Sequence, residues 1–446
     1  EDVGRRRRRG SLRWLGAEDA GPSMRPHVLY VTPIFGYPPF GGPRLRTYHT
    51  LRALARCADV TLYLTQQPDT PNREAAREHV LSFCRDLVWP DLPLAPMGGR
   101  LRSVARALLP AGVRARLRRR VEQPNAAVQT DKLDELTSWV QAHQPDLIWL
   151  GFGGISYQLV PLRERTGALL VIETECVWSR FILRELPFES DAQRRAAIER
   201  EGRAKQAEER FGALHADLTT AVSEVDADYF RALAPDAERV MLLHNVIDVD
   251  AYQRGEPRVA LQQPAFVFAG SMSRGTANVD ATRWLVEVVL PQVWRSRPDV
   301  HLYLVGRDPA PEVIACRGPR VHVTGEVASI VPYLRACAAA LVPLRWESGT
   351  RFKILEAFAC HAPVISTTLG AEGLAVENGR HLLLADEPEA FAAAMLAVLQ
   401  QPALARSMVE PAYDLVRREY DVSSAERQIG SILTQLGFPI GAPASL

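Results

Sequence analysis

Residues 346–373, WESGTRFKILEAFACHAPVISTTLGAEG, combine glycine, cationic and acidic side chains in a pattern that could bind an anion. A turn of small residues (348–350) follows an apolar run and precedes a helical pattern over about 351–360. Such a turn exposes backbone N–H groups at the positive end of the helix dipole, where anions bind. Arg351 and Lys353 fall in the first turn, where cations are unfavourable unless an anion is bound. The segment therefore predicts a site for a phosphate-like group.

Lys353 and Glu356 are three residues apart and share one face of this predicted helix. Apolar residues surround the pair, so we expect a largely buried helix whose two polar side chains border a cavity. The alternative is a simple ion pair on the surface.

Two Asp-x-Asp pairs, at 226–228 and 248–250, have the spacing seen in metal-dependent transferases. Both fall in a predicted helix or linker rather than after a phosphate-binding loop. The ten histidines form no i, i+4 pair. We therefore expect no metal site.

The elements that position these side chains follow from short apolar runs that alternate with amphipathic helical stretches from His27 onward. Continuous apolar strands alternating with helices are typical of parallel sheets covered on both faces. A Pro- and Gln-containing stretch near 255–264 separates two such series. We therefore predict an α/β protein with two Rossmann-like domains that face across a cleft, the natural ligand site. The predicted strands are 27–32, 60–65, 146–151, 168–173, 217–222, 239–243, 266–270, 300–306, 320–324, 339–343, 363–366 and 381–384, and helical patterns include 46–57, 131–143, 201–214, 279–294 and 388–399.

The 446 residues are 47% hydrophobic and 24% charged with a net charge of +1, which excludes a mostly disordered chain and argues against nucleic acid as a partner. The six cysteines are scattered without a Cys-x-x-Cys pair, and no apolar run reaches the roughly 18 residues that span a membrane. We expect a cytoplasmic protein with reduced thiols. Residues 1–23 are expected to be a disordered leader. Residues 100–121 carry eight arginines and predict either peripheral binding to the anionic inner face of the membrane or a solvated charged helix.

Within 266–420, the segments GSM (270–272), NVD (278–280), VTG (323–325) and GTRFKILEA (349–357) follow one another in an order and spacing that resemble family-four (group 1) retaining glycosyltransferases. PPFGGPRLR (38–46) and HNVID (244–248) resemble the family more weakly. The resemblance implies the GT-B fold and sugar transfer from a nucleotide-diphosphate donor to a glycolipid or polysaccharide acceptor, with retention and with no cofactor or metal.

By this resemblance, Glu356 matches the second glutamate of a Glu-x7-Glu motif and would bind the nucleotide ribose, while Lys353 and Arg351 would face the diphosphate. The other residues that it implies at the donor are Gly270 and Ser271 near phosphate, Gly325 near the base, and Gly349 and Thr350 through their backbone. Those at the transferred sugar and acceptor are Gly41, Gly42 and Arg46.

The resemblance also implies an acceptor domain (24–246), a donor domain (247–420) and a C-terminal segment (421–446) whose helix packs back on the first domain. Two positions depart from the family pattern. Ser348 stands where the first glutamate is usual, with Glu347 one position out of register, and Thr174-Glu175 replace a histidine, so that Glu175 becomes a substitute near the sugar. Two other functions stay open: a nucleotide-sugar 2-epimerase, and a non-catalytic partner subunit, which the absent glutamate favours.

Overall fold

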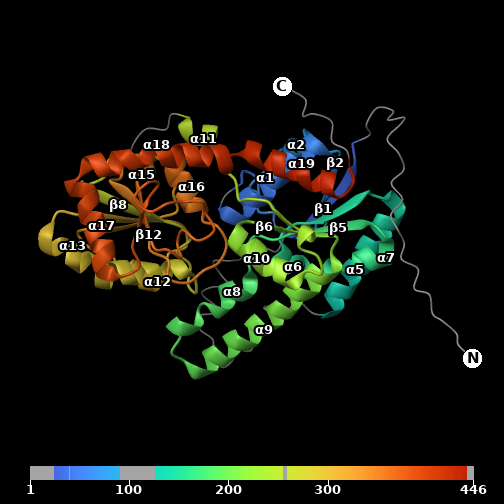
Figure 1. Cartoon of the computed structure of the whole chain (residues 1–446), viewed down its shortest axis with the longest axis horizontal. Helices are drawn as coiled ribbons and strands as arrows, with labels where there is room; N and C mark the ends of the chain where they lie inside the picture. The colour runs from blue at the N-terminus through green and yellow to red at the C-terminus, as the bar shows by residue number, and fades with distance from the viewer. Residues whose placement is uncertain (1–24, 40, 91–125, 255–258, 439–446) are drawn as a thin grey trace, which may run out of the picture.

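The computed structural model describes residues 25–39, 41–90, 126–254 and 259–438. Two parallel sheets, each flanked by helices, lie beside each other along the long axis of the molecule (Figure 1). The predicted pair of Rossmann-like α/β domains is therefore confirmed.

The first sheet has the strand order β3-β2-β1-β4-β5-β6-β7. Its strands are β1 (His27–Thr32), β2 (Asp59–Leu64), β3 (Asp86–Val88), β4 (Leu147–Leu150), β5 (Leu169–Glu173), β6 (Leu218–Ala221) and β7 (Val240–Leu242). Its helices are α1 (Gly42–Cys57), α2 (Arg73–Leu81), α5 (Ala126–His143), α6 (Gly153–Ser156), α7 (Leu162–Thr166), α8 (Trp178–Leu183), α9 (Ala192–His215) and α10 (Glu224–Leu233).

The second sheet has the order β10-β9-β8-β11-β12-β13. Its strands are β8 (Ala265–Ala269), β9 (His301–Val305), β10 (Val321–Gly325), β11 (Ala339–Val342), β12 (Val364–Ser366) and β13 (Leu383–Leu384). The helices of this half are α11 (Val249–Gln253), α12 (Ala277–Trp284), α13 (Leu290–Ser296), α14 (Pro311–Ile314), α15 (Val331–Ala336), α16 (Phe352–Ala359), α17 (Pro388–Gln400) and α18 (Pro402–Glu419), and α19 (Val422–Gln435) ends the described chain.

The central strands are buried along almost their whole length because helices cover both faces of each sheet. In each sheet the strand order reverses beside the first strand, between β1 and β4 and between β8 and β11. Ligands of open α/β sheets bind at the carboxyl ends of the strands at such reversals. The segments placed there are the start of α1 in the first domain and the start of α16 in the second.

The predicted strands all exist, with ends shifted by at most two residues, but four helix predictions need correction. The helix expected at 201–214 begins at 192, where the Asp191 side chain caps it by accepting from the Arg194 N–H. The helix expected at 279–294 is interrupted by a π-helical turn over 285–289, because Pro291 lacks an N–H and its ring displaces the carbonyl four residues earlier. The helices expected from 46 and from 131 begin at Gly42 and at Ala126.

The chain crosses between the domains twice, and the two crossings lie side by side. The Ile247 N–H donates to the Tyr420 carbonyl (2.9 Å), and the Val422 N–H donates to the Ile247 carbonyl (3.1 Å). After the second crossing α19 packs on α1, with Ile429 and Ile432 in the core of the first domain. Figure 1 shows α18 and α19 running consecutively from one domain to the other.

The predictions for residues 1–23 and 100–121 lie outside the described residues. Within the described ranges, no helix is both long enough and apolar enough to cross a membrane.

Candidate active site

A cavity of about 1020 Å³ lies between the two domains. It is lined by the start of α1 and the segment after β5 on one side, and by the loops after β8, β9, β10 and β11 on the other. The predicted residues on its wall are Gly41, Gly42, Arg46, Glu175, Gly270, Ser271, Thr350, Arg351, Lys353 and Glu356. Two predicted residues do not line it. Gly325 ends β10, and the loop 327–331 beyond it lines the cavity instead, while Gly349 packs behind the wall.

The α16 helix begins at the cavity with its first turn uncapped. Its N-cap residue, Arg351, provides no side-chain hydrogen bond to the helix, and the first turn has no acidic residue. The free N–H groups and the helix dipole therefore point their positive end at the cavity wall. A strongly amphipathic sequence produces this placement, because Ile354, Leu355 and Phe358 are buried in the domain core.

Lys353 and Glu356 both border the cavity but do not bond to each other. The Lys353 Nζ donates to Asn278 Oδ1 (2.7 Å) and lies 4.9 Å from the centre of the Phe268 ring. Glu356 Oε1 accepts from the Tyr252 hydroxyl (2.9 Å). Among the described side chains neither residue enters an ion pair, so the structure does not support the surface ion-pair alternative.

Burial moves the pKa values of both side chains toward neutral pH. It lowers the pKa of Lys353 to about 8, although the nearby Glu347 carboxylate opposes the shift. It raises the pKa of Glu356 to about 7, although the hydrogen bond from Tyr252 and the charge of Lys353 oppose it. A half-buried ammonium with no carboxylate partner is costly in the ligand-free protein, and a bound anion stabilises it.

The position of the missing first glutamate is occupied by a serine with an unused hydroxyl. Ser348 is buried and its Oγ has no hydrogen-bond partner. Glu347, one position earlier, lies 2.8 Å from the Nε of the buried Arg351 and so is already paired. The Nη1 of Arg351 also lacks a partner.

The loop after β8 approaches Lys353 closely because it carries glycine. Gly270 has a φ of 152°, and a Cβ there would lie 2.8 Å from Asn278 Nδ2 and 3.2 Å from Lys353 Nζ. Asn278 also donates to the Ser271 carbonyl (2.7 Å). Asn278 therefore orients both the lysine and the loop, a role that its place within the NVD segment did not reveal.

The first domain contributes a buried arginine to the opposite wall. The Nε of Arg46 lies 2.9 Å from Glu173 Oε1, at the carboxyl end of β5. Glu173 also accepts from the hydroxyl of Tyr30 (3.0 Å) and the indole of Trp149 (2.8 Å), so its buried charge is fully engaged. Sequence reasoning missed Glu173, although an acid that ends the apolar run LLVIE is a usable signal.

Asn245 connects the two walls. It accepts from Arg46 Nη1 (2.8 Å), and its amide donates to the Thr350 hydroxyl (2.8 Å) in the loop before α16. Sequence reasoning also missed Asn245, whose role depends on a contact between residues 105 positions apart.

Glu175 lies on the first-domain wall with one carboxyl oxygen engaged and one free. Its Oε1 accepts from the Trp178 indole, whereas its Oε2 is buried without a partner. Burial raises the pKa of this carboxyl to about 7. A Cβ added to Gly349 would lie 2.8 Å from the Glu175 carbonyl oxygen and 2.8 Å from the Cys176 Cβ. The two domains are therefore in close contact at this point.

Both Asp-x-Asp pairs serve local structure. Asp248 caps α11 by accepting from the Ala251 N–H (3.1 Å), and Asp250 pairs with Arg417. Asp226 is buried 3.7 Å from Arg180. Across the described ranges, no group of three or more His, Cys, Asp or Glu side chains is arranged to hold a metal ion.

Comparison with known proteins bears on the second domain and on the fold. Residues 263–401 match the family described as Glycosyl transferases group 1. No curated protein matches the chain in sequence. Among solved structures, HepE from Anabaena in complex with UDP has a TM-score of 0.59 at 16% identity, over 91% of this chain and 99% of that one.

Sucrose-phosphate synthase from Thermosynechococcus elongatus has a TM-score of 0.65 at 16% identity, over 93% of this chain and 99% of that one. A protein from Listeria monocytogenes described as a UDP-N-acetylglucosamine 2-epimerase has a TM-score of 0.55 at 14% identity, over 95% of this chain and 99% of that one. These similarities confirm the GT-B fold and a group 1 glycosyltransferase domain in the second half of the chain.

Proposed function

We propose that the protein is a nucleotide-sugar-dependent glycosyltransferase. The observation that carries the proposal is the uncapped start of α16 beside Lys353, an ammonium that has no carboxylate partner among the described residues. A diphosphate bound there receives backbone N–H groups and a cation in a partly buried site. HepE, similar in fold, is described in complex with UDP and with UDP-glucose, which supports a nucleotide-sugar donor.

In this proposal Glu356 binds the ribose hydroxyls, and Arg351, Lys353 and the helix start stabilise the negative charge that grows on the departing diphosphate. Such preorganised charge lowers the barrier without a metal ion, so we propose metal-independent transfer. Retention of configuration rests on the resemblance of the second domain to the group 1 family.

The acceptor is proposed to be a glycan or lipid-linked sugar that enters along the first-domain wall. Gly41 and Gly42 open α1 there, and Tyr48, His49 and Arg52 continue the cavity along the same helix. The six cysteines, all within the described residues, form no disulfide, which agrees with a reducing compartment. We propose a cytoplasmic protein with peripheral contact to the membrane through 100–121.

The test is a screen of UDP, GDP, ADP and their sugars by thermal shift, followed by turnover with the donor that binds. We expect Lys353→Ala to lower kcat about 100- to 1,000-fold with a smaller loss of donor affinity, because its charge acts most in the transition state. Glu356→Ala should mainly weaken nucleotide binding. Lys132→Ala, at a half-buried lysine outside the cavity, is the control. Wild-type turnover in Lys353→Ala would contradict the diphosphate assignment.

A 2-epimerase is the second candidate, and the similarity in fold to the Listeria protein is the observation in its favour. An epimerase would convert the sugar nucleotide without any acceptor, whereas a transferase slowly releases the nucleoside diphosphate. A non-catalytic subunit, which the serine at 348 favours, would do neither. NMR analysis of the products of one donor incubation separates the three.

A further inference from the structure

Among the described residues that line the cavity, six buried polar atoms have no hydrogen-bond partner. Two of them, Nε of Arg46 and Nε of Arg351, lie in ion pairs, whereas the other four, two from each domain, do not. They are Nη2 of Arg46 and Oε2 of Glu175 from the first domain, and Oγ of Ser348 and Nη1 of Arg351 from the second. Buried polar atoms are almost always hydrogen-bonded, so unpartnered atoms gathered around one cavity mark the place of a polar ligand. A sugar ring offers hydroxyl groups on several sides and can reach atoms of both walls.

The two arginines that carry these nitrogens are already paired with carboxylates. Arg46 pairs with Glu173 and Arg351 pairs with Glu347, each at less than 3 Å. Neither arginine therefore brings an uncompensated positive charge to the subsite. A ligand carboxylate bound to these two arginines would lose its hydration and would compete with the carboxylates that already pair with them.

We infer that Glu175 selects the sugar of the donor: its free carboxyl oxygen bonds to a sugar hydroxyl, and the subsite admits uncharged sugars while it rejects sugars that carry a carboxylate. The inference rests on the proposed function, which it deepens by naming the class of donor. It depends on the free Oε2 of Glu175, the pairing of Arg46 and Arg351 with carboxylates, and the hydroxyl of Ser348.

The protonation of Glu175 determines how strongly it rejects an anionic sugar. Burial raises the pKa of this carboxyl to about 7, against the hydrogen bond from Trp178 and the charge of Arg46. The other ionisable groups around it are Glu173 on β5, Cys176 beside it and Tyr157, with Glu347 and Arg351 across the cavity. Below pH 7 the carboxylic acid can donate to a sugar oxygen. Above pH 7 the carboxylate still accepts from a hydroxyl but repels a second carboxylate.

The experiment measures dissociation constants for three ligands that share one nucleotide: UDP, UDP-glucose and UDP-glucuronate. If GDP is the nucleotide that binds, the set is GDP, GDP-mannose and GDP-mannuronate. The two sugars of each set differ only in a hydroxymethyl group or a carboxylate at C6. Their affinity ratio therefore cancels the titration of Lys353 and Glu356, which face the nucleotide in the proposed function.

We expect the neutral sugar to bind about tenfold or more tightly than the uronate at pH 8, and the ratio to grow as pH rises from 6 to 8. In Glu175→Gln the ratio should be smaller and independent of pH. The glutamine oxygen can still accept from the Trp178 indole, so this variant preserves the local fold. Glu185→Gln, at a half-buried carboxylate that pairs with Arg194 outside the cavity, should behave like the wild type.

Preference for the uronate, or an unchanged ratio and pH dependence in Glu175→Gln, would overturn the inference while nucleotide binding upheld the proposed function. Failure of UDP, GDP and ADP alike to bind would overturn both. Glu175→Ala gives an independent measure: it should reduce the gain in affinity from nucleotide to neutral nucleotide sugar by about threefold to tenfold, the effect of one lost hydrogen bond. A wild-type gain in that variant would also contradict the inference.

Discussion

At the scale of single residues, the proposed chemistry depends on side chains whose charge is poorly tolerated in the ligand-free protein. Lys353 is partly buried beside an uncapped helix start, and Glu356 is held by one hydroxyl. The charged form of each side chain is disfavoured, because burial removes water from it and no described residue forms an ion pair with it. In the proposed function a bound nucleotide supplies the diphosphate charge to Lys353 and ribose hydroxyls to Glu356, which explains why these residues are costly to the fold and useful to the site.

The lowered pKa of Lys353, about 8, predicts pH-dependent nucleotide binding. Bound diphosphate favours the protonated lysine and so raises its pKa, which means that binding above pH 8 takes up a proton. The affinity for the nucleoside diphosphate should fall by up to about tenfold per pH unit above pH 8. Isothermal titration at pH 7, 8 and 9 measures this. Lys353→Arg keeps its charge and should lose the decline; a parallel decline in that variant would assign it to another group.

The pKa of Glu356, raised to about 7, predicts that the stability of the ligand-free protein falls as pH rises. The folded protein holds a proton that the unfolded chain releases near its ordinary pKa of about 4.5. This contribution to stability is therefore present at pH 4 and is lost as pH rises through 7. Glu356→Gln should raise the melting temperature of the ligand-free protein at pH 8 but not at pH 5, measured by calorimetry. Equal shifts at both values would contradict the assignment.

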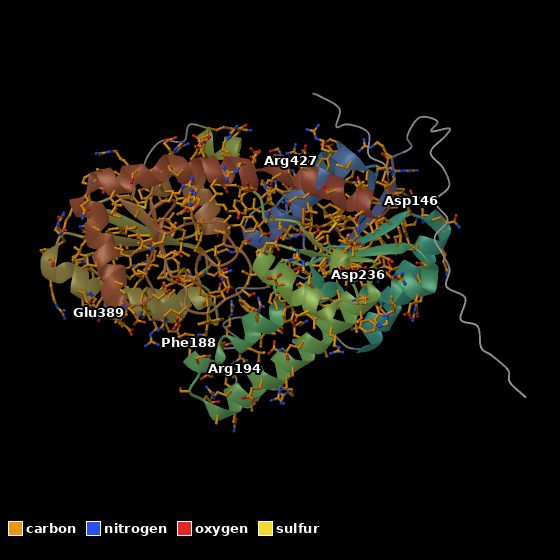
Figure 2. The ribbon with its side chains drawn as sticks, viewed as in Figure 1. Asp146, Phe188, Arg194, Asp236, Glu389 and Arg427 are labelled. Carbon is orange, nitrogen blue, oxygen red and sulfur yellow. The ribbon has the colours of Figure 1, made fainter. Side chains whose placement is uncertain are left out.

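At the scale of elements, the loops at the carboxyl ends of the strands hold the two walls together. Arg184, at the end of α8, donates to both oxygens of Glu372 (2.6 and 2.9 Å) and to the Glu347 carbonyl (2.8 Å). The guanidinium carbon of Arg345, in the second domain, lies 4.8 Å from the centre of the Phe188 ring in the first. Figure 2 shows Phe188 beside the second domain, on the α8–α9 segment that projects from the first. This segment therefore fixes the loop that carries Ser348 and Arg351.

Loss of the Arg184 contact should loosen the donor loop without unfolding either domain. We expect Arg184→Ala to weaken donor binding about threefold to tenfold, because a charge-assisted pair of this kind contributes roughly 1 kcal/mol. Glu372→Gln should have a similar effect, and the double variant should be no worse than either single variant. Arg194→Ala, on an exposed part of the same segment, is the control. Additive losses would show that the two residues act independently.

Gly349 tests how closely the two walls must approach. Its φ of 81° costs about 1–2 kcal/mol for any other residue, and a Cβ would meet Cys176 and the Glu175 carbonyl at 2.8 Å. Gly349→Ala should therefore abolish nucleotide-sugar binding and lower stability. Gly379→Ala has the same backbone conformation with nothing within 4 Å, so it should show only the backbone cost. Equal binding in the two variants would refute a role for Gly349 in the approach of the domains.

At the scale of the whole molecule, the domains are joined by the paired crossings and by α19. The helix belongs to the second half of the sequence, yet Ile429, Ile432 and Leu433 are fully buried in the core of the first domain. The last element of the described chain therefore stabilises the first domain.

Truncation of one α19 side chain should destabilise the first domain. Ile432→Ala removes a fully buried side chain, and we expect a loss of about 2–4 kcal/mol in the free energy of unfolding. Ser431→Ala, at an exposed position of the same helix, should be close to neutral. Denaturation with urea measures both. A neutral Ile432→Ala would show that α19 does not contribute to the core.

The sequence by itself determined the strands and the order of the domains, because continuous apolar runs report burial on both faces of a parallel sheet directly. It also identified the start of α16, since glycine, cations and an apolar helix lie next to one another in the chain. The helix ends were missed because they depend on capping side chains or, in one case, on Pro291. The strand β3 was missed because it has only three residues, which form a strand only by pairing in the sheet. Only the tertiary structure brought Asn245 to Thr350, Asn278 to Lys353 and Arg184 to Glu372. Such contacts join residues about 75 to 188 positions apart, and a sequence pattern records local periodicity, not which distant polar atoms meet.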